Sequence, residues 1–236
     1  MIERRVILLI QIKIPVEELK RKIRPIKMIV FDFDGTLTNV SNIWDHIHRC
    51  LGTMKKAKEN EKLFMEHKIN GIEWGRMDSS LWIGRSVEEL RMCIERVKLY
   101  DNCIETLLYL KDKGYMLSLI SAGLDFVMKE LMIDELFDYV YINKILIEDG
   151  KISGSEITVS LDNKGRLLRE IMDEVGLKKE NCAAVGDGET DIFLFKNVGL
   201  SIAMNPKGEK LEKFVDVVLK TNDLRDLMDL FELRGF

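Results

Sequence analysis

The sequence predicts an α/β fold in which a parallel sheet lies between two layers of helices and an all-helical segment follows the first strand. Two observations predict it. From residue 100 onward, short apolar runs rich in β-branched residues alternate with amphipathic segments, which is the pattern of strand–helix–strand units. Between residues 39 and 99 the apolar residues instead keep the spacing of helices.

The first 26 residues form a separate N-terminal extension. The apolar run at residues 6–14 is shorter than the roughly 20 residues that span a membrane. Residues 16–24 have the pattern of a short amphipathic helix. The extension either adds an edge strand and a helix to the fold, or is upstream sequence ahead of a true start at Met28. We favour the second interpretation.

The first strand of the core is predicted at residues 28–33, an apolar run that would be buried on both faces of a sheet. Asp32 and Asp34 are two positions apart, so in an extended chain both carboxylates point to the same side. They would repel each other by roughly 4 kcal/mol at about 4 Å and an effective dielectric of about 20. A hard divalent cation such as Mg²⁺ would relieve this repulsion. A solvated turn around Gly35 is the alternative.

Residues 39–99 are predicted to form a helical cap of four short helices. Apolar residues recur at helical spacing near both ends of this segment: Ile43, Ile47, Cys50 and Leu51, and again Val87, Leu90, Ile94 and Val97. Ser86 and Glu89 have the spacing of a capping box. A cap here would cover the carboxylates and exclude water, which favours a small substrate. One cluster is either a solvated face or a specificity surface: Arg76, Asp78 and Arg85.

Residues 27–38 and 100–236 are predicted to form a Rossmann-like three-layer core. Asp149 and Gly150, between alternating β-formers, predict a hairpin turn. The other strands are expected at residues 116–120, 139–142, 182–185, 200–203 and, at the sheet edge, 215–219. The helices are expected at residues 104–113, 125–132, 164–175, 192–196 and 223–230.

Polar residues follow several of these strands. Ser121 and Gly123 come after the strand at 116–120, Asp187 and Asp191 come after the strand at 182–185, and Lys164 begins a helix. Because the carboxyl ends of parallel strands meet in one crevice, these residues are expected to form one site. Simpler interpretations remain open: an exposed helix lysine for Lys164, a turn residue for Ser121, and a helix N-terminal charge for Asp191.

These motifs, in the order DFDGT, SAG, the Lys-Gly of DNKGR and GDGETD, resemble those of the haloacid dehalogenase (HAD) superfamily, most closely its phosphoserine-phosphatase-like branch. The resemblance covers residues 27–231. It implies a Mg²⁺-dependent phosphatase that hydrolyses a small phosphorylated metabolite, a phosphomonoester, through an aspartyl-phosphate intermediate. The alternatives are a phosphotransferase or mutase on the same fold, and a non-catalytic ligand-binding module.

The resemblance also implies a role for each matching residue. Asp32 would be the nucleophile and Asp34 the general acid and base. Mg²⁺ would be bound by Asp32, Asp187 and the backbone carbonyl of Asp34. The phosphate would be bound by Ser121, Ala122, Gly123 and Lys164. Asp191 and Thr190 would support this site from behind, with Thr190 at a position where the family usually has asparagine.

The cap departs from the branch that the motifs resemble. Ser41 stands where phosphoserine phosphatases carry a glutamate for the substrate ammonium, and Leu81 or Trp82 stands where they carry an arginine for the carboxylate. We therefore expect L-phosphoserine to be a poor substrate, and a less zwitterionic or more aromatic-compatible ester to be preferred. The three tryptophans are expected in the cap core, with a pocket lining as the alternative: Trp44, Trp74 and Trp82.

Composition limits the partners and the compartment. A net charge of −4 and a pI near 5.6 offer no basic surface for nucleic acid, and no apolar run is long enough for a membrane span. The oligomeric state is left open. The cysteines lack a Cys-x-x-Cys pattern, so we expect reduced thiols in a cytoplasmic protein: Cys50, Cys93, Cys103 and Cys182. The histidines are expected to be surface or packing residues rather than metal ligands: His46, His48 and His67.

Overall fold

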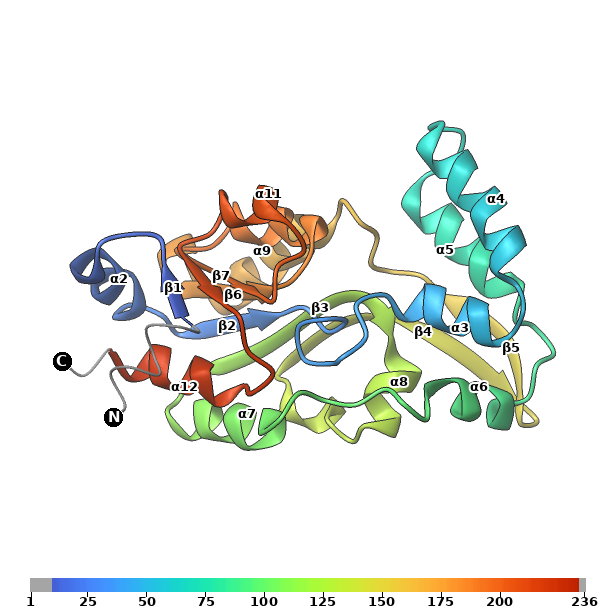
Figure 1. Cartoon of the computed structure of the whole chain (residues 1–236), viewed down its shortest axis with the longest axis horizontal. Helices are drawn as coiled ribbons and strands as arrows, with labels where there is room; N and C mark the ends of the chain where they lie inside the picture. The colour runs from blue at the N-terminus through green and yellow to red at the C-terminus, as the bar shows by residue number, and fades with distance from the viewer. Residues whose placement is uncertain (1–9, 234–236) are drawn as a thin grey trace.

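The computed structural model describes residues 10–233, in which the strands form one eight-stranded sheet in the order β1-β8-β7-β6-β2-β3-β4-β5 (Figure 1). The strands from β8 to β4 pair in parallel, and the outermost pairs, β1 with β8 and β4 with β5, are antiparallel. The predicted α/β class is confirmed. The strands are β1 Ile10–Ile12, β2 Met28–Phe31, β3 Met116–Leu124, β4 Tyr139–Glu148, β5 Lys151–Glu156, β6 Cys182–Gly186, β7 Leu200–Met204 and β8 Val217–Leu219.

Strand β2 lies at the centre of the sheet and is buried on both faces, as its continuous apolar run predicts. Its side chains alternate between two hydrophobic clusters: Ile29 and Phe31 join one, and Met28 and Val30 join the other. The two clusters place helices on both faces of the sheet. This is the predicted three-layer core.

The helices of the core divide between these two clusters. The cluster of Ile29 and Phe31 includes residues from α2 (Val16–Ile23), α7 (Cys103–Asp112), α8 (Asp125–Glu130) and α12 (Arg225–Glu232). The other cluster includes residues from α9 (Lys164–Val175), α10 (Ile192–Phe195) and α11 (Glu209–Glu212). Short 3₁₀ turns are η1 (Asp134–Leu136), η2 (Lys179–Asn181) and η3 (Glu189–Asp191). Among the described residues, no helix is long and apolar enough to cross a membrane.

The edge of the sheet differs from the prediction. Residues 215–219 were expected to form the edge strand, but β8 pairs with β7 on one side and with β1 on the other, with Ile10 opposite Leu219. Residues 10–23 thus form the edge strand and helix that were one of the two alternatives for the extension. Helix α2 buries Leu19 and Ile23 in the core, which explains its apolar spacing. The first part of the predicted apolar run, residues 6–9, lies outside the described residues.

The cap consists of four helices that lie between β2 and β3 in the sequence (Figure 1): α3 (Ile43–Cys50), α4 (Met54–Met65), α5 (Gly71–Ser80) and α6 (Val87–Ile94). The predicted capping box at Ser86 and Glu89 is present at the start of α6. The hairpin of β4 and β5 extends beyond the core to the cap, where the amide of Gly84 donates to the Ile152 carbonyl (2.8 Å) and that of Val87 to the Gly150 carbonyl (2.9 Å). The hairpin therefore attaches the cap to the sheet.

The expectation of four reduced cysteines is wrong for two of them. Cys50, the last residue of α3, and Cys93 in α6 form a disulfide, with Cα atoms 5.6 Å apart. The packing of α3 against α6 brings together positions that are 43 residues apart, and no local pattern in the sequence reports this. Cys103 and Cys182 are free and buried, and burial raises the pKa of each thiol to about 12.

Candidate active site

Asp32 follows directly after β2 and is linked to a buried lysine. Its backbone amide continues the sheet ladder by donating to the Val185 carbonyl at 2.9 Å. The Nζ of Lys164 lies 2.8 Å from Oδ1 of Asp32 and 2.7 Å from Oδ1 of Asp191. Burial alone would lower the pKa of Lys164, but the carboxylates of Asp191 and Asp32 outweigh it and raise the pKa above its ordinary value. Lys164 is only 2 % exposed, so it is not the exposed helix lysine of the alternative interpretation.

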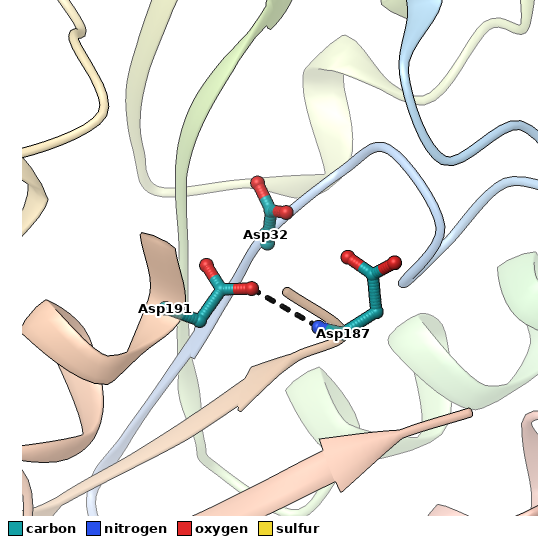
Figure 2. Close-up of side chains that lie close together, drawn as sticks. All are labelled: Asp32, Asp187 and Asp191. Carbon is teal, nitrogen blue, oxygen red and sulfur yellow. Dashed lines mark hydrogen bonds between the residues drawn. The ribbon is translucent and has the colours of Figure 1, made fainter. Parts of the chain in front are cut away.

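Asp191 organises the loop after β6 (Figure 2). Its Oδ2 accepts hydrogen bonds from the backbone amides of Asp187 and Gly188, each at 3.0 Å, while its Oδ1 faces Lys164. Gly186 makes this arrangement possible, because a Cβ there would lie 2.4 Å from Cγ of Asp191. Both oxygens of Asp191 are therefore engaged within the protein, one by Lys164 and one by the loop after β6.

Asp34 lies in the turn after β2 rather than in the strand, because β2 ends at Phe31. Gly35 has a φ of +75°, and a Cβ on it would lie 2.2 Å from Oδ2 of Asp187, so this turn requires glycine. The Oδ2 of Asp34 accepts a hydrogen bond from the amide of Ile43 at the start of α3 (2.9 Å). Burial, assisted by the charge of Asp32 and opposed by this hydrogen bond, raises the pKa of Asp34 to about 7.

Three buried carboxylates meet at the ends of β2 and β6: Asp32, Asp187 and Asp191 (Figure 2). One oxygen from each lies within 4.8 Å of the others. Burial and the neighbouring Asp32 charge raise the pKa of Asp187 to about 7, while Lys207 opposes this shift. An all-oxygen donor set with uncompensated charge fits Mg²⁺. Asp191 uses both oxygens within the protein, whereas Asp32 and Asp187 each face a lysine with one oxygen and have the other available for an ion.

Residues 121–123 form the end of β3, where the pairing with β4 becomes irregular between Ser121 and Leu124. The amide of Gly123 donates to Oγ of Ser121 at 3.0 Å. Because this oxygen accepts, the hydroxyl hydrogen of Ser121 remains available for another acceptor. The carbonyl of Ala122 accepts from Nε1 of Trp44 (2.8 Å) and from Nδ2 of Asn143 (3.0 Å). These bonds fix the SAG segment against the cap and β4.

Asn143 was not identified from the sequence. It is buried in β4, where its amide nitrogen donates to the carbonyls of Ala122 and Val159 and its oxygen accepts from the amides of Thr158 and Val159. It thus connects the SAG segment to the chain that leads to Lys164. The available signal was its position directly after the predicted strand at 139–142, at the same sheet edge as the other site residues.

One cavity of about 270 Å³ lies between the core and the cap. Most residues predicted for the site line it: Asp32, Asp34, Ser121, Ala122, Gly123, Lys164, Asp187 and Thr190. Asp191 does not line it and lies behind Lys164. Lys207, which the sequence did not single out, contributes a second cation, with its Nζ 3.4 Å from Oδ2 of Asp187.

The cap contributes aromatic and acidic side chains to this cavity. Trp44 and Trp74 line it, whereas Trp82 is fully buried in the cap core and stacks on Trp44 with ring centroids 5.1 Å apart. The expected core position is thus confirmed for Trp82, and the alternative holds for the other two. Asp45 and Asp78 also line the cavity. Asp78 belongs to the cluster for which a solvated face or a specificity surface was expected; it is buried at the cavity, whereas Arg76 and Arg85 are exposed. Helical periodicity did not single out Asp45, because its position at the cavity depends on how the cap helices pack.

The histidines are packing or surface residues, as expected. Nε2 of His46 lies 2.8 Å from the carbonyl of Cys93. His48 is buried in the cap beside Trp82, and His67 is exposed at the end of α4. The rings of His46 and His48, both on α3, therefore face different partners.

The fold and the four motifs define a class of hydrolase. Residues 26–199 match the model of the haloacid dehalogenase-like hydrolase family, which covers more than half of the chain. The chain belongs to this family. The predictions of HAD membership and of a phosphoric monoester hydrolase are therefore confirmed.

The chain is also similar in sequence to individual phosphoserine phosphatases. The chain is 35 % identical to the phosphoserine phosphatase of Methanocaldococcus jannaschii over 204 residues, which cover 86 % of this chain and 96 % of that protein. It is 29 % identical to the phosphoserine phosphatase of Campylobacter jejuni subsp. doylei, covering 86 % and 98 %.

Solved structures show the same likeness. A substrate-bound phosphoserine phosphatase complex superimposes with a TM-score of 0.70 at 32 % identity, covering 86 % of this chain and 97 % of that chain. A phospho-aspartyl intermediate analogue of phosphoserine phosphatase gives a TM-score of 0.69 at 33 % identity, covering 86 % and 98 %.

Proposed function

We propose that this protein is a Mg²⁺-dependent phosphatase that hydrolyses a small phosphomonoester through an aspartyl-phosphate on Asp32. One observation carries the proposal: a single cavity holds a carboxylate paired with a buried lysine, Asp32, beside a carboxyl whose pKa is about 7, Asp34. The first faces a lysine and is placed to attack, and the second can carry a proton near neutral pH. The likeness to a phospho-aspartyl intermediate analogue supports the same chemistry.

The two aspartates divide the reaction into two steps. In the first, an oxygen of Asp32 bonds to phosphorus, the bond from phosphorus to the alcohol oxygen breaks, and Asp34 gives its proton to that oxygen. In the second, Asp34 takes a proton from water as the water oxygen bonds to phosphorus and the bond to Asp32 breaks. Phosphate leaves, and both aspartates return to their starting states.

The remaining residues of the site offset the negative charge of the phosphate and of Asp32. Lys164 alone would offset only part of the repulsion between the Asp32 carboxylate and the charged phosphate oxygens. The free hydroxyl of Ser121 and the amides of the SAG segment supply further hydrogen-bond donors to the phosphate. Mg²⁺ would be held by Asp32, Asp187 and the backbone carbonyl of Asp34, and when bound it would offset the negative charge of the phosphate and the carboxylates. Asp191 holds Lys164 and the loop of Asp187 in place, next to Thr190.

The resemblance to phosphoserine phosphatases supports a small amino-acid-like substrate, but the cap argues against a close match. Ser41 lines the cavity where that branch carries a glutamate, and no arginine lines the cavity among the described residues. No observation favours a phosphotransferase. The complete set of Asp32, Asp34 and Lys164 argues against a non-catalytic module.

We keep a cytoplasmic location as part of this proposal. The disulfide is compatible with it only in organisms whose intracellular proteins carry disulfides, such as hyperthermophiles. The charged fraction of 32 % and the single glutamine, Gln11, agree with such a source.

The test is phosphate release from p-nitrophenyl phosphate and from small phosphomonoesters, with Mg²⁺ and with a chelator. We expect release that depends on Mg²⁺ and is lost in Asp32→Asn, because an amide is a poor nucleophile. Asp173→Asn, the same change at an exposed position of α9, is the matched control and should keep the activity. Activity near the wild-type rate in Asp32→Asn would contradict the proposal.

A further inference from the structure

The two ends of the cavity differ in whether cationic side chains accompany their carboxylates. At the phosphate end lie Lys164 and Lys207, and each faces a carboxylate of the site, at 2.8 Å from Asp32 and 3.4 Å from Asp187. Among the described residues that line the cavity, these two are the only cations. The cap end is lined instead by two carboxylates and two indole rings, from Asp45, Asp78, Trp44 and Trp74.

The carboxylate of Asp78 is buried beside an amide and an imidazole. Its side chain is 7 % exposed, and its Oδ1 accepts a hydrogen bond from Nδ2 of Asn60 at 2.8 Å. The ring of His48 lies nearby, with Nε2 3.6 Å from Oδ2 of Asp78. Nε1 of Trp82 donates to Nδ1 of His48 at 3.1 Å. The same Nδ1 also lies 2.7 Å from Oγ1 of Thr53. An ammonium group would give Asp78 the cationic partner that no lysine or arginine among the described residues provides.

Asp45 also keeps room for a ligand. Its Oδ2 lies 3.2 Å from Nη2 of Arg49, one helical turn further along α3, and the Arg49 side chain is 69 % exposed. Exposed pairs of this kind contribute little and leave most of the carboxylate's acceptor sites free. A cation inside the cavity would meet Asp45 in a less hydrated place than Arg49 does.

The two indole rings add to this preference. Trp44 stacks on Trp82 with centroids 5.1 Å apart, and Trp74 stacks on Phe64 with centroids 4.7 Å apart. Each ring therefore has one face covered by an aromatic neighbour while it also borders the cavity. Indole faces attract ammonium groups through their quadrupole. The acidic and the aromatic residues of the cap end thus favour the same kind of ligand.

We propose that the substrate is an amino-alcohol phosphate: a phosphomonoester whose alcohol carries an ammonium group and no carboxylate. This rests on the proposed phosphatase function. The phosphate binds at the lysine end, and the ammonium lies between Asp45, Asp78 and the indoles. A substrate carboxylate at the cap end would face two like charges and would lose its water without gaining a cation.

Three esters of similar size test the proposal. O-phosphoethanolamine carries the ammonium, 2-hydroxyethyl phosphate replaces it with a neutral hydroxyl, and L-phosphoserine adds a carboxylate. Because the ammonium would make a charge-assisted contact with the cap carboxylates, kcat/KM for O-phosphoethanolamine should exceed that for 2-hydroxyethyl phosphate by roughly tenfold to a hundredfold. L-phosphoserine should rank below O-phosphoethanolamine. If L-phosphoserine ranks first, or if the charged and neutral esters are turned over equally, the proposal is wrong.

Substitutions of Asp78 and Asp45 test whether these carboxylates bind the ammonium group. Asp78→Asn keeps the size of the side chain but removes its charge, so the ratio of kcat/KM between O-phosphoethanolamine and 2-hydroxyethyl phosphate should fall by roughly tenfold. Asp45→Asn should lower the same ratio, and it serves as the second variant if Asp78→Asn does not fold. A ratio unchanged in every folded variant of these two would overturn the proposal.

Arg76 is the matched control, since it lies on α5 beside the cavity residues but is exposed and does not line the cavity. Arg76→Gln should leave the ranking of the three esters unchanged. A selective loss of L-phosphoserine turnover in this variant would show that an arginine binds a substrate carboxylate, against the proposal.

The same assays test the substrate class and the phosphatase function separately. Phosphate release from p-nitrophenyl phosphate without a preference for O-phosphoethanolamine would contradict the substrate class alone. A lack of Mg²⁺-dependent release from every ester, p-nitrophenyl phosphate included, would contradict the proposed function and this inference with it.

Discussion

Nε1 of Trp44 donates a 2.8 Å hydrogen bond to the backbone carbonyl of Ala122, and so joins the first cap helix to the segment that ends β3. The bond connects the part of the cap that lines the cavity with the proposed phosphate-binding residues. Asp34 makes a second connection, because its side chain accepts from the amide of Ile43 at the start of the same helix. The position of α3 is therefore linked to the geometry of the reacting groups.

Trp44→Phe should lower the free energy of unfolding by about 1 kcal/mol through loss of this hydrogen bond. Trp74→Phe is the matched control, because Nε1 of Trp74 is buried and has no hydrogen-bond partner among the described residues. Removing that donor should cost less, since no bond is broken. Chemical denaturation of both variants checks the difference. Equal losses in the two would show that the bond to Ala122 does not stabilise the fold.

The roles of Asp32 and Asp34 can be separated with p-nitrophenyl phosphate, whose leaving group needs little protonation. Asp34→Asn should still form the phospho-enzyme but hydrolyse it slowly, by roughly 10²- to 10⁴-fold, because the general base is missing. Stopped-flow absorbance should then show a burst of about one p-nitrophenol per active site, as expected for covalent catalysis.

Asp32→Asn, which removes the nucleophile, should give no burst. A burst of the same size in this variant would place the covalent step on a different residue. Steady turnover without a burst in Asp34→Asn would show that Asp34 is not needed for the second step.

The sequence was most informative where side chains follow the strands of the parallel sheet. Helix α9 has the predicted bounds, 164–175, and Lys164 faces Asp32 as the convergence of strand ends implied. The pattern of a strand buried on both faces was enough to place Asp32 at the carboxyl end of β2. Local sequence and sheet topology together determine this half of the site.

The cap half of the site could not be predicted in the same way. Asp78 lies at the cavity because α4, α3 and α5 bring Asn60 and His48 around it, and no periodicity in the sequence reports such packing. The disulfide depends on the same helix packing. The sequence left an edge strand in the N-terminal extension as one of two alternatives, because the pairing of β1 with β8 joins segments about two hundred residues apart, Ile10 with Leu219.

The disulfide predicts a defined number of reactive thiols. In denaturant without reductant, only Cys103 and Cys182 should react with a thiol reagent, and all four cysteines should react after reduction. A bridge between residues 43 apart in sequence should stabilise the protein by up to about 4 kcal/mol through the entropy of the unfolded chain. Reductant should therefore lower the Tm of the wild type.

The double variant Cys50→Ser, Cys93→Ser supplies the control for that measurement. Its Tm should already be low and should not respond to reductant. Four reactive thiols in the unreduced, denatured wild type would show that the bridge does not form.

The buried carboxyls predict how stability depends on pH in the absence of metal. The folded-state pKa values of Asp34 and Asp187 are raised from 3.8 to about 7. A raised carboxyl pKa means that the folded state binds protons more tightly than the unfolded state. The contribution to stability is therefore fully present below pH 3.8 and is lost as the pH rises through about 7.

Metal-free protein should lose stability between pH 4 and pH 8, by at most about 4 kcal/mol for Asp187, because each pKa unit corresponds to about 1.4 kcal/mol. Mg²⁺ should reverse this loss, since it binds the ionised carboxylates, and a concentration of about 100 Kd should add about 2.7 kcal/mol at pH 8. Denaturation with Mg²⁺ or with a chelator, at several pH values, measures both effects. Asp187→Asn should have a flatter pH dependence and a smaller response to Mg²⁺. If this variant keeps the full slope and the full Mg²⁺ response, Asp187 is neither the titrating group nor a metal ligand.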